Sequence, residues 1–278
     1  MRVEGNGLTR IDDPADPRIA EFRDIKERDL AGRRGRFIIE GTVVLRMAAA
    51  AHGAGAFEIE KILLLENRLD GVRDILATVP DDVPAYVASG GVLDAIAGFH
   101  LHRGILALGR RMAEPDLDSL IDTLPKKALV VAACGISNHD NIGAMFRNAA
   151  AFGADAVLLD ETCCDPLYRK ALRVSVGSVL SVPYARGGSI LSLLERLAER
   201  GLSIWGLSPS GQSDLRDIPP ESQGIVLVTG TEGEGLPDTV MNRFGTARIS
   251  QRPGLDSLNA GMATGIALYE IARIQQKI

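Results

Sequence analysis

Three polar clusters in the second half of the chain contain residue types that do chemistry at binding sites. An arginine can stabilise a developing negative charge, and a carboxylate beside exposed backbone suits a ligand that bears hydroxyls and amines. The glycine spacing in the second cluster does not match the dinucleotide-binding fingerprint, and no Walker lysine follows it. The clusters are Asn138 to Gly143 with Arg147 one helical turn later, Thr229 to Gly235 with Glu232 at its centre, and Ser257-Leu258-Asn259.

The clusters also have purely structural interpretations. Asn259 precedes the apolar segment 260–274, and asparagine is a favoured residue at the start of a helix. Arg147 could equally pair with an acid of its own fold. Small residues in the apolar segment let another backbone or a ligand approach closely. These small residues are Ala260, Gly261, Ala263, Gly265 and Ala267.

The elements that must position these clusters alternate between strands and helices. Apolar runs predict strands, and segments with helical periodicity lie between them. This pattern indicates a parallel sheet with helices on both faces, in which ligands bind beyond the carboxyl ends of the strands. All three clusters follow such ends. The predicted strands are 128–134, 156–159, 203–207, 225–228 and 247–249, and the predicted helices are 141–152, 167–178, 190–200, 238–244 and 260–274.

The first half of the chain predicts a separate, smaller α/β domain at 1–112, followed by a linker at 113–127 with one short helix at 117–124. An amphipathic helix at 19–36 carries a surplus of arginines that could follow a phosphate backbone, although a solvated helical face is an alternative. The other predicted elements are strands at 37–39, 61–65, 85–87 and 105–108, and helices at 41–51, 72–78 and 90–97.

Composition limits the class of protein. The net charge of −5 argues against unspecific nucleic-acid binding, although local basic patches matter more than the total. The apolar stretches are too short to span a bilayer, and no signal pattern precedes them, so we expect a cytoplasmic protein without a membrane partner. The three cysteines and four histidines have no metal-site spacing, and we expect no metal.

In this order, the three clusters resemble the three motifs of the SpoU/TrmH family of RNA ribose 2′-O-methyltransferases, within the SPOUT superfamily. The resemblance covers residues from Ala128 to the C-terminus, and Phe37-Ile38-Ile39-Glu40-Gly41 more loosely resembles the family's N-terminal substrate-binding domain. The matching motifs are Asn141-x-Gly143-x-x-x-Arg147-x-Ala149-x-x-Phe152-Gly153, Gly230-x-Glu232-Gly233-x-Gly235, and Ile249 through Ser257-Leu258-Asn259 to Ala267-Leu268-Tyr269-Glu270.

The resemblance implies an α/β fold with a C-terminal parallel-sheet SPOUT domain at 128–278 that contains a trefoil knot, and a small N-terminal α/β domain that binds RNA. It implies S-adenosylmethionine as methyl donor, S-adenosylhomocysteine as product, no metal, and a homodimer formed through the C-terminal domain. The implied residues are Arg147, Glu232, Ser257 and Asn259 for catalysis; Thr229, Gly230, Glu232, Gly235, Ile249, Leu258 and Asn259 for the donor; and Asn141, Arg147, Arg33, Arg34 and Arg36 for RNA.

Methyl transfer from a sulfonium is an in-line displacement, so the protein must orient the ribose hydroxyl and stabilise its developing charge. Because the pKa of arginine is above ~12, we expect Arg147 to stabilise the incipient alkoxide while a phosphate or water takes the proton.

The resemblance favours ribosomal over transfer RNA as the substrate. The alternatives are an RNA-binding paralogue that no longer methylates and a SPOUT enzyme that acts on a base nitrogen. Departures from the family pattern concern the donor pocket, and they are His139, Ser250, Gln251 and Gly261.

Overall fold

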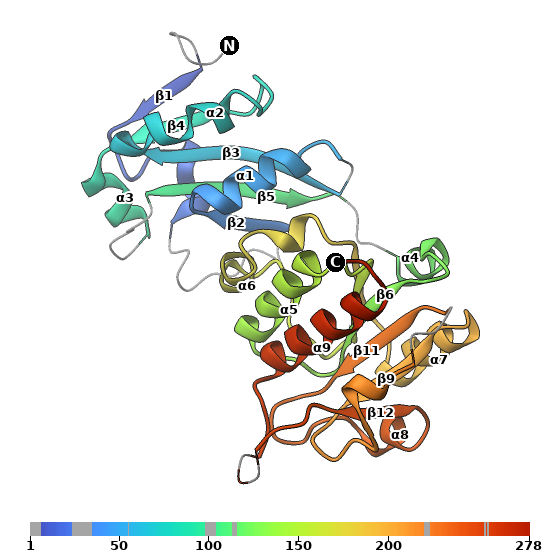
Figure 1. Cartoon of the computed structure of the whole chain (residues 1–278). Coiled ribbons are helices and arrows are strands. Elements are labelled where there is room, and N and C mark those ends of the chain that lie inside the picture. Colours follow the sequence, from blue (N-terminus) through green and yellow to red (C-terminus); the bar gives the residue numbers. More distant parts are fainter. Residues whose placement is uncertain are drawn as a thin grey trace. The chain divides into compact units, whose positions relative to one another are not determined.

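The computed structural model describes residues 7–23, 35–54, 56–97, 104–112, 116–219, 223–252, 254 and 256–278. The chain divides into two compact units (Figure 1). The N-terminal unit comprises Met1–Glu114 together with Leu167–Leu180, and the C-terminal unit comprises Pro115–Pro166 and Ser181–Ile278. Among the described residues, no helix is both long enough and apolar enough to cross a membrane.

The N-terminal unit is built on a mixed sheet with the strand order β1-β4-β3-β5-β2. Strands β1 and β3 run parallel to β4, whereas β5 is antiparallel to both β3 and β2. Alternate strand residues face opposite sides, and helix α3 and the 3-10 helix η1 cover one face with a shared apolar core. The strands are β1 Leu8–Ile11, β2 Arg36–Glu40, β3 Phe57–Leu65, β4 Ala85–Ala88 and β5 Ile105–Arg111. The helices are η1 Pro17–Phe22, α1 Thr42–Ala51, η2 Glu66–Arg68, η3 Asp70–Val72, α2 Arg73–Leu76 and α3 Gly90–Ala97.

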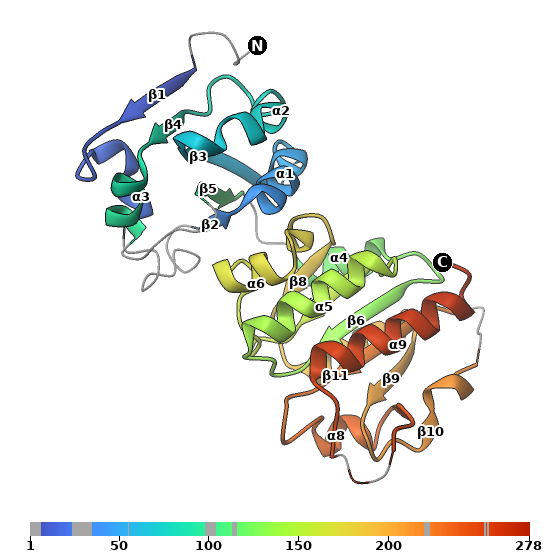
Figure 2. The same cartoon turned by 60° about the vertical axis from the view of Figure 1, so that its left-hand side comes forward.

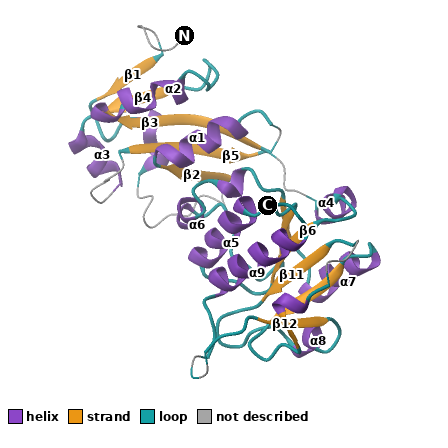
Figure 3. Ribbon diagram, in the orientation of Figure 1, coloured by secondary structure: helices purple, strands orange, loops and turns teal. Residues whose placement is uncertain are grey.

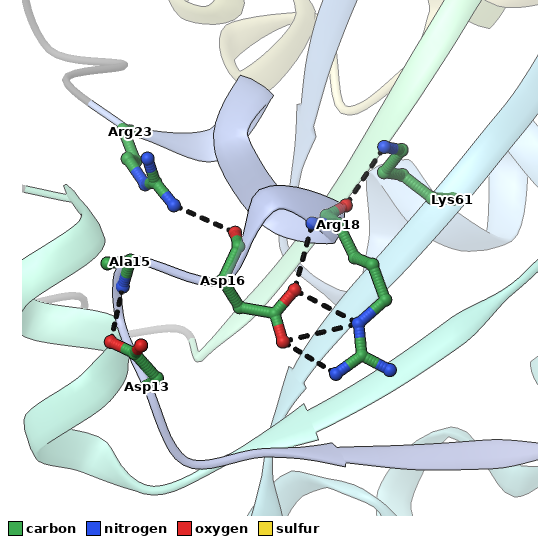
Figure 4. Close-up of polar contacts among 6 residues, drawn as sticks. All are labelled: Asp13, Ala15, Asp16, Arg18, Arg23 and Lys61. Atoms are coloured by element: carbon green, nitrogen blue, oxygen red, sulfur yellow. Dashed lines mark hydrogen bonds and ion pairs between the residues drawn. The ribbon is translucent and has the colours of Figure 1, made fainter.

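The prediction of a helix at 19–36 is wrong at both of its described ends. At its start the chain forms only the short η1, and the backbone of Arg23 is extended. At its end, Arg36 is the first residue of β2. The guanidinium of Arg23 donates to the carbonyl of Pro14. It also donates to the carbonyl of Asp16, whose carboxylate accepts from the backbone and side chain of Arg18 (Figure 4). These local bonds favour a compact turn over a continuing helix. The remainder, 24–34, lies outside the described residues, and so do Arg33 and Arg34.

A segment from the second half of the chain belongs to the N-terminal unit. Helix α6 (Arg169–Val174) packs on β2, and the 3-10 helix η4 (Ser178–Leu180) lies against α1. The buried carboxylate of Glu40 accepts hydrogen bonds from Arg169 at 3.2 Å and from Arg173 at 3.4 Å. Burial lowers the pKa of Arg169. The sequence had placed this helix in the C-terminal domain.

The C-terminal unit contains a sheet of seven parallel strands in the order β10-β12-β9-β11-β6-β7-β8. Helices α4, α7 and α8 share an apolar core with one face, and α5 and α9 lie side by side on the other (Figures 2 and 3). The predicted parallel sheet covered on both faces is therefore confirmed. The strands are β6 Leu129–Ala133, β7 Ala156–Leu159, β8 Tyr184–Arg186, β9 Ser203–Leu207, β10 Ser213–Asp214, β11 Ile225–Thr229 and β12 Gly245–Arg248. The helices are α4 Leu117–Thr123, α5 His139–Ala151, α7 Ile190–Glu199, η5 Leu215–Asp217, α8 Asp238–Met241 and α9 Ala260–Ile274.

Most of the segment predicted as a linker, 113–127, instead packs in the C-terminal unit. The side chain of Ile121 on α4 is fully buried in the core of this unit. On the outer side of the helix, Arg196 of α7 pairs with Asp118 at 3.2 Å and with Asp122 at 3.7 Å. Two turns of amphipathic helix were too short for the sequence pattern to reveal a packed element.

The trefoil knot that the resemblance implies for the C-terminal domain stays a prediction.

Candidate active site

A pocket opens beyond the carboxyl ends of β9, β11 and β12, with a volume of about 290 Å³. This is the edge of a parallel sheet where ligands bind. Most residues predicted to hold the donor line this pocket, and so does Ser257. The lining residues from the second cluster and from the third family motif are Thr229, Gly230, Thr231, Glu232, Gly233, Glu234, Gly235, Ile249, Ser257 and Leu258.

The loop after β11 has a conformation that only glycine permits at several positions. An added Cβ at Gly230 would lie 2.3 Å from the carbonyl oxygen of Gly235, so no other residue fits without moving the backbone. Thr231 and Gly235 exchange two backbone hydrogen bonds of 3.2 Å, and Gly233 and Gly235 have φ values of +99° and +74°. The result is a tight turn that contains Glu232, the residue after Thr231.

The three sequence clusters meet at Glu232. Its Oε1 atom accepts a hydrogen bond of 2.8 Å from Nδ2 of Asn141, on the first turn of α5. The same Oε1 atom accepts a second hydrogen bond, of 2.7 Å, from Nδ2 of Asn259. This Nδ2 also donates to Oδ1 of Asn141 at 2.7 Å. The Oδ1 atom of Asn259 accepts from the backbone of Met262 at 3.1 Å and so caps α9. The capping interpretation of Asn259 is therefore correct, and the same side chain joins the polar network.

Helices α5 and α9 approach closely within one chain. A Cβ at Gly261 would lie 2.7 Å from Cβ of Ala144, and one at Gly265 would lie 2.7 Å from Nδ2 of Asn148. Asn148 donates to the carbonyl of Gly261 at 2.9 Å. The small residues at 261 and 265 thus allow α5 of the same chain to approach, a neighbour that could not be predicted from their spacing in the sequence. The glycine at 261, one of the departures from the family pattern, avoids an overlap with Ala144.

Comparison with known proteins identifies the family. Residues 128–269 match the SpoU rRNA Methylase family. The chain belongs to the SpoU methylase family. It is similar to a protein of Mycobacterium bovis described as an uncharacterized tRNA/rRNA methyltransferase, with 35% identity over 97% of this chain and 93% of that protein. The chain is therefore an RNA methyltransferase of this family, and the predicted resemblance is confirmed.

Solved structures show the same fold. A structure described as an RNA 2′-O ribose methyltransferase is similar with a TM-score of 0.80 and 27% identity. The match covers 96% of this chain and 100% of the other. The AdoMet-bound rRNA methyltransferase of Sinorhizobium meliloti has a TM-score of 0.80 and 22% identity, covering 97% of this chain and 99% of the other. The α/β SPOUT fold inferred from sequence is thus confirmed.

The pocket of this SpoU methylase is acidic. Three carboxylates, those of Glu232, Glu234 and Asp256, line it, and no described lining residue is basic. A site for a phosphate-bearing nucleotide needs cationic or clustered N–H donors. The lining instead suits a ligand with a positive charge and amino groups.

Not every predicted site residue joins this network. Arg147 is exposed on α5 outside the pocket lining, and the described part of the chain gives it no hydrogen bond or ion pair. Arg36 is engaged elsewhere, because its guanidinium pairs with Glu60 at 2.8 Å and with Glu21 at 3.9 Å. Its predicted role in RNA binding would therefore require these pairs to open.

The departures from the family pattern have clear positions. Ser250 donates to the carboxylate of Asp214, and bonds from Arg216 and Ser250 hold the pKa of Asp214 well below its usual range. Gln251 lines the pocket, and its side chain donates to the carbonyl of Asp256 at 3.4 Å. His139 is the first residue of α5. Of these three residues, only Gln251 lines the pocket, two positions after Ile249.

Part of the site was not predicted from the sequence. Ser208, Pro209 and Ser210 line the pocket after β9, and the rule that ligands bind beyond strand ends could have found them. Asn148 was missed because its bond to Gly261 depends on helix packing. Burial raises the pKa of the Cys134 thiol to about 12, so this thiol is no nucleophile at neutral pH. The described residues contain no group of three or more His, Cys, Asp or Glu side chains able to hold a metal.

Proposed function

We propose that this SpoU methylase transfers the methyl group of S-adenosylmethionine to a ribose 2′-hydroxyl of RNA, with ribosomal RNA favoured over transfer RNA as substrate. The similar structure described as an RNA 2′-O ribose methyltransferase supports the ribose hydroxyl as acceptor. The description of the matching family supports ribosomal RNA.

The pocket fits the proposed donor. S-adenosylmethionine, when bound, supplies an electrophilic methyl group on a positively charged sulfur. The acidic lining suits that charge, and the absence of a side chain at Gly230 lets the backbone of Gly235 approach and form the turn beside the pocket. Backbone groups around Thr229, Ile249 and Leu258 would hold the adenosine, with Gly235 closing the turn.

The network of Asn141, Glu232 and Asn259 carries the proposal. Both amides donate to Oε1 of Glu232, and Oε2 has no described partner. This second oxygen is available to orient a ribose hydroxyl or the guanidinium of Arg147. Ser257, at the pocket mouth, would take part in orienting the hydroxyl. Fixed groups of this kind lower a barrier because they need no reorganisation during the reaction.

Arg147 is the proposed partner of the incipient alkoxide. It is an exposed cation on the helix that also carries Asn141. A guanidinium stays protonated, so it stabilises negative charge without taking the proton. Water or an RNA phosphate is left as the proton acceptor.

The test is methyl transfer from labelled S-adenosylmethionine to total RNA from cells that lack the gene for this protein. A 2′-O-methyl group blocks attack of the 2′-oxygen on the neighbouring phosphodiester. We therefore expect labelled dinucleotides that resist alkaline hydrolysis, absent with Glu232→Gln. Label in alkali-sensitive nucleotides would favour a base nitrogen as acceptor. RNA binding without transfer or donor binding would favour a paralogue that no longer methylates.

We also propose that the protein is a homodimer formed through the C-terminal domain. Helix α9 exposes three apolar side chains at helical spacing, with exposures of 61% for Met262, 42% for Ile266 and 50% for Tyr269. An apolar stripe beside an active site is typical of an interface. Light scattering should give twice the chain mass for the wild type and the monomer mass for Ile266→Glu. A monomeric wild type would contradict this.

A further inference from the structure

A buried carboxylate outside the pocket lies at the centre of a second polar network. Asp160 directly follows β7 and is only 4% exposed. Its Oδ1 atom accepts from the backbone N–H and hydroxyl of Thr162 at 3.0 and 2.8 Å, and from the backbone of Cys163 at 3.0 Å. The backbone N–H of Gly135 lies 3.2 and 3.1 Å from its two oxygens. A buried charge is tolerated where it is saturated with donors in this way.

The bond to Gly135 reaches toward the active site. Gly135 follows β6 and has φ of +67°, and a Cβ there would lie 2.9 Å from Cγ2 of Thr231. Thr231 begins the turn that presents Glu232. Asp160 thus holds a glycine that packs against the base of this turn.

The same network also contacts the segment that precedes α5, on the other side of the active site. After Gly135 the chain continues through Ile136 to Asn138, which caps α5. The N–H of Ile136 lies 3.3 Å from Sγ of Cys163, and its carbonyl accepts from Cys164 at 2.9 Å. The segment 135–138, which leads into α5 and so to Asn141 and Arg147, is therefore hydrogen-bonded to the turn at 160–164, whose N–H groups Asp160 accepts.

We propose that Asp160 is a positioning residue for methyl transfer, which sets the Glu232 turn against the first turn of α5. The inference rests on the proposed function. Asp160 does not line the donor pocket, and neither do Gly135, Ile136, Thr162, Cys163 and Cys164. Among the residues of this network and its contacts, only Thr231 lines the pocket. Its loss should therefore affect turnover more than donor binding.

The chain offers a matched control at the opposite end of the same strand. Asp155 immediately precedes β7, and its Oδ2 accepts from the backbone of Leu129 and from Lys277, both at 2.7 Å. Asp155→Asn and Asp160→Asn each replace a carboxylate that accepts backbone N–H groups. Only Asp160 lies at the end of the strand that faces the site.

The experiment measures kcat, KM for RNA and the dissociation constant of S-adenosylmethionine, well below the melting temperature of each variant. We expect Asp160→Asn to lower kcat by about tenfold or more, since small displacements at an active site have large effects, and to change donor affinity by less than about threefold. Asp155→Asn should keep kcat within about twofold. Thr162→Val removes only the hydroxyl donor and should give a smaller loss of kcat, which keeps the test open if Asp160→Asn does not fold. Equal kcat values for the two Asp→Asn variants, or an unchanged kcat in Thr162→Val, would overturn the inference.

Hydrogen exchange separates this inference from the proposed function. Asp160→Asn, or Thr162→Val to a lesser extent, should reduce amide protection at 134–142 and 231–235, and Asp155→Asn should not. If the wild type transfers no methyl group to RNA, the proposed function fails while the exchange comparison still decides the inference. Unchanged protection at 231–235 would overturn it even in an active enzyme.

Discussion

A buried pair of hydroxyls joins α9 to the strand that ends at the donor pocket. Thr264 is fully buried and Thr229 is 4% exposed, and their Oγ1 atoms lie 2.8 Å apart. Thr264 also donates to the carbonyl of Ala260 at 2.8 Å. Because a hydroxyl has one proton, Thr229 must be the donor in the pair.

Replacing Thr264 by valine removes the acceptor for that proton while nearly keeping the side-chain shape. A buried hydroxyl without its partner costs about 1–3 kcal/mol, so we expect Thr264→Val to lower the free energy of unfolding by about 2 kcal/mol. Thr229→Val leaves Thr264 bonded to Ala260 and should cost less than about 1 kcal/mol. The double variant should cost less than Thr264→Val alone, since no hydroxyl remains without a partner.

The assay is a urea titration followed by the fluorescence of Trp205. This is the only tryptophan in the sequence, and it lies on β9, so it reports on the C-terminal unit. Equal costs for the two single variants, or a double variant as costly as their sum, would refute the assigned donor direction.

Three further predictions follow from other parts of the structure. Gly261→Ser should destabilise the C-terminal unit by about 1–3 kcal/mol in the same titration through overpacking against Ala144, and adding Ala144→Gly should restore part of the loss; full stability of the single variant would contradict the contact. Arg147→Ala should lower kcat by about a hundredfold or more and leave donor affinity, measured by calorimetry, within about threefold; unchanged turnover would exclude the proposed role. Hydrogen bonds from Arg18 lower the pKa of Asp16 to about 2, so its stabilisation should be present above the unfolded pKa near 4 and be lost as the pH falls toward 2. The melting-temperature difference between wild type and Asp16→Asn should accordingly shrink over that range, and a difference independent of pH would rule this out.

Much of the fold of the C-terminal unit could be predicted because its signals are local. The apolar run at 128–134 and the glycine after helix α7 are marks of a buried strand and a helix end, and the structure has β6 and α7 there. β8 and β10 were missed because runs of three and two residues carry too little periodicity. The membership of α6 in the N-terminal unit rests on contacts with residues distant along the chain, among them its ion pairs with Glu40, more than a hundred positions earlier.

The sequence by itself determined which residues gather at the site. Asn141, Glu232 and Asn259 follow ends of parallel strands, and parallel strands place their carboxyl ends at one edge, so the sequence places these side chains at the same edge of the sheet. Only the tertiary structure decided the partner of each group: that Gly261 faces Ala144 of the same chain, that Arg36 pairs with Glu60, and that Asp160 braces Gly135. The physical reason is that periodicity and turn chemistry act over a few residues, whereas a contact partner is set by the packing of elements that are distant along the chain.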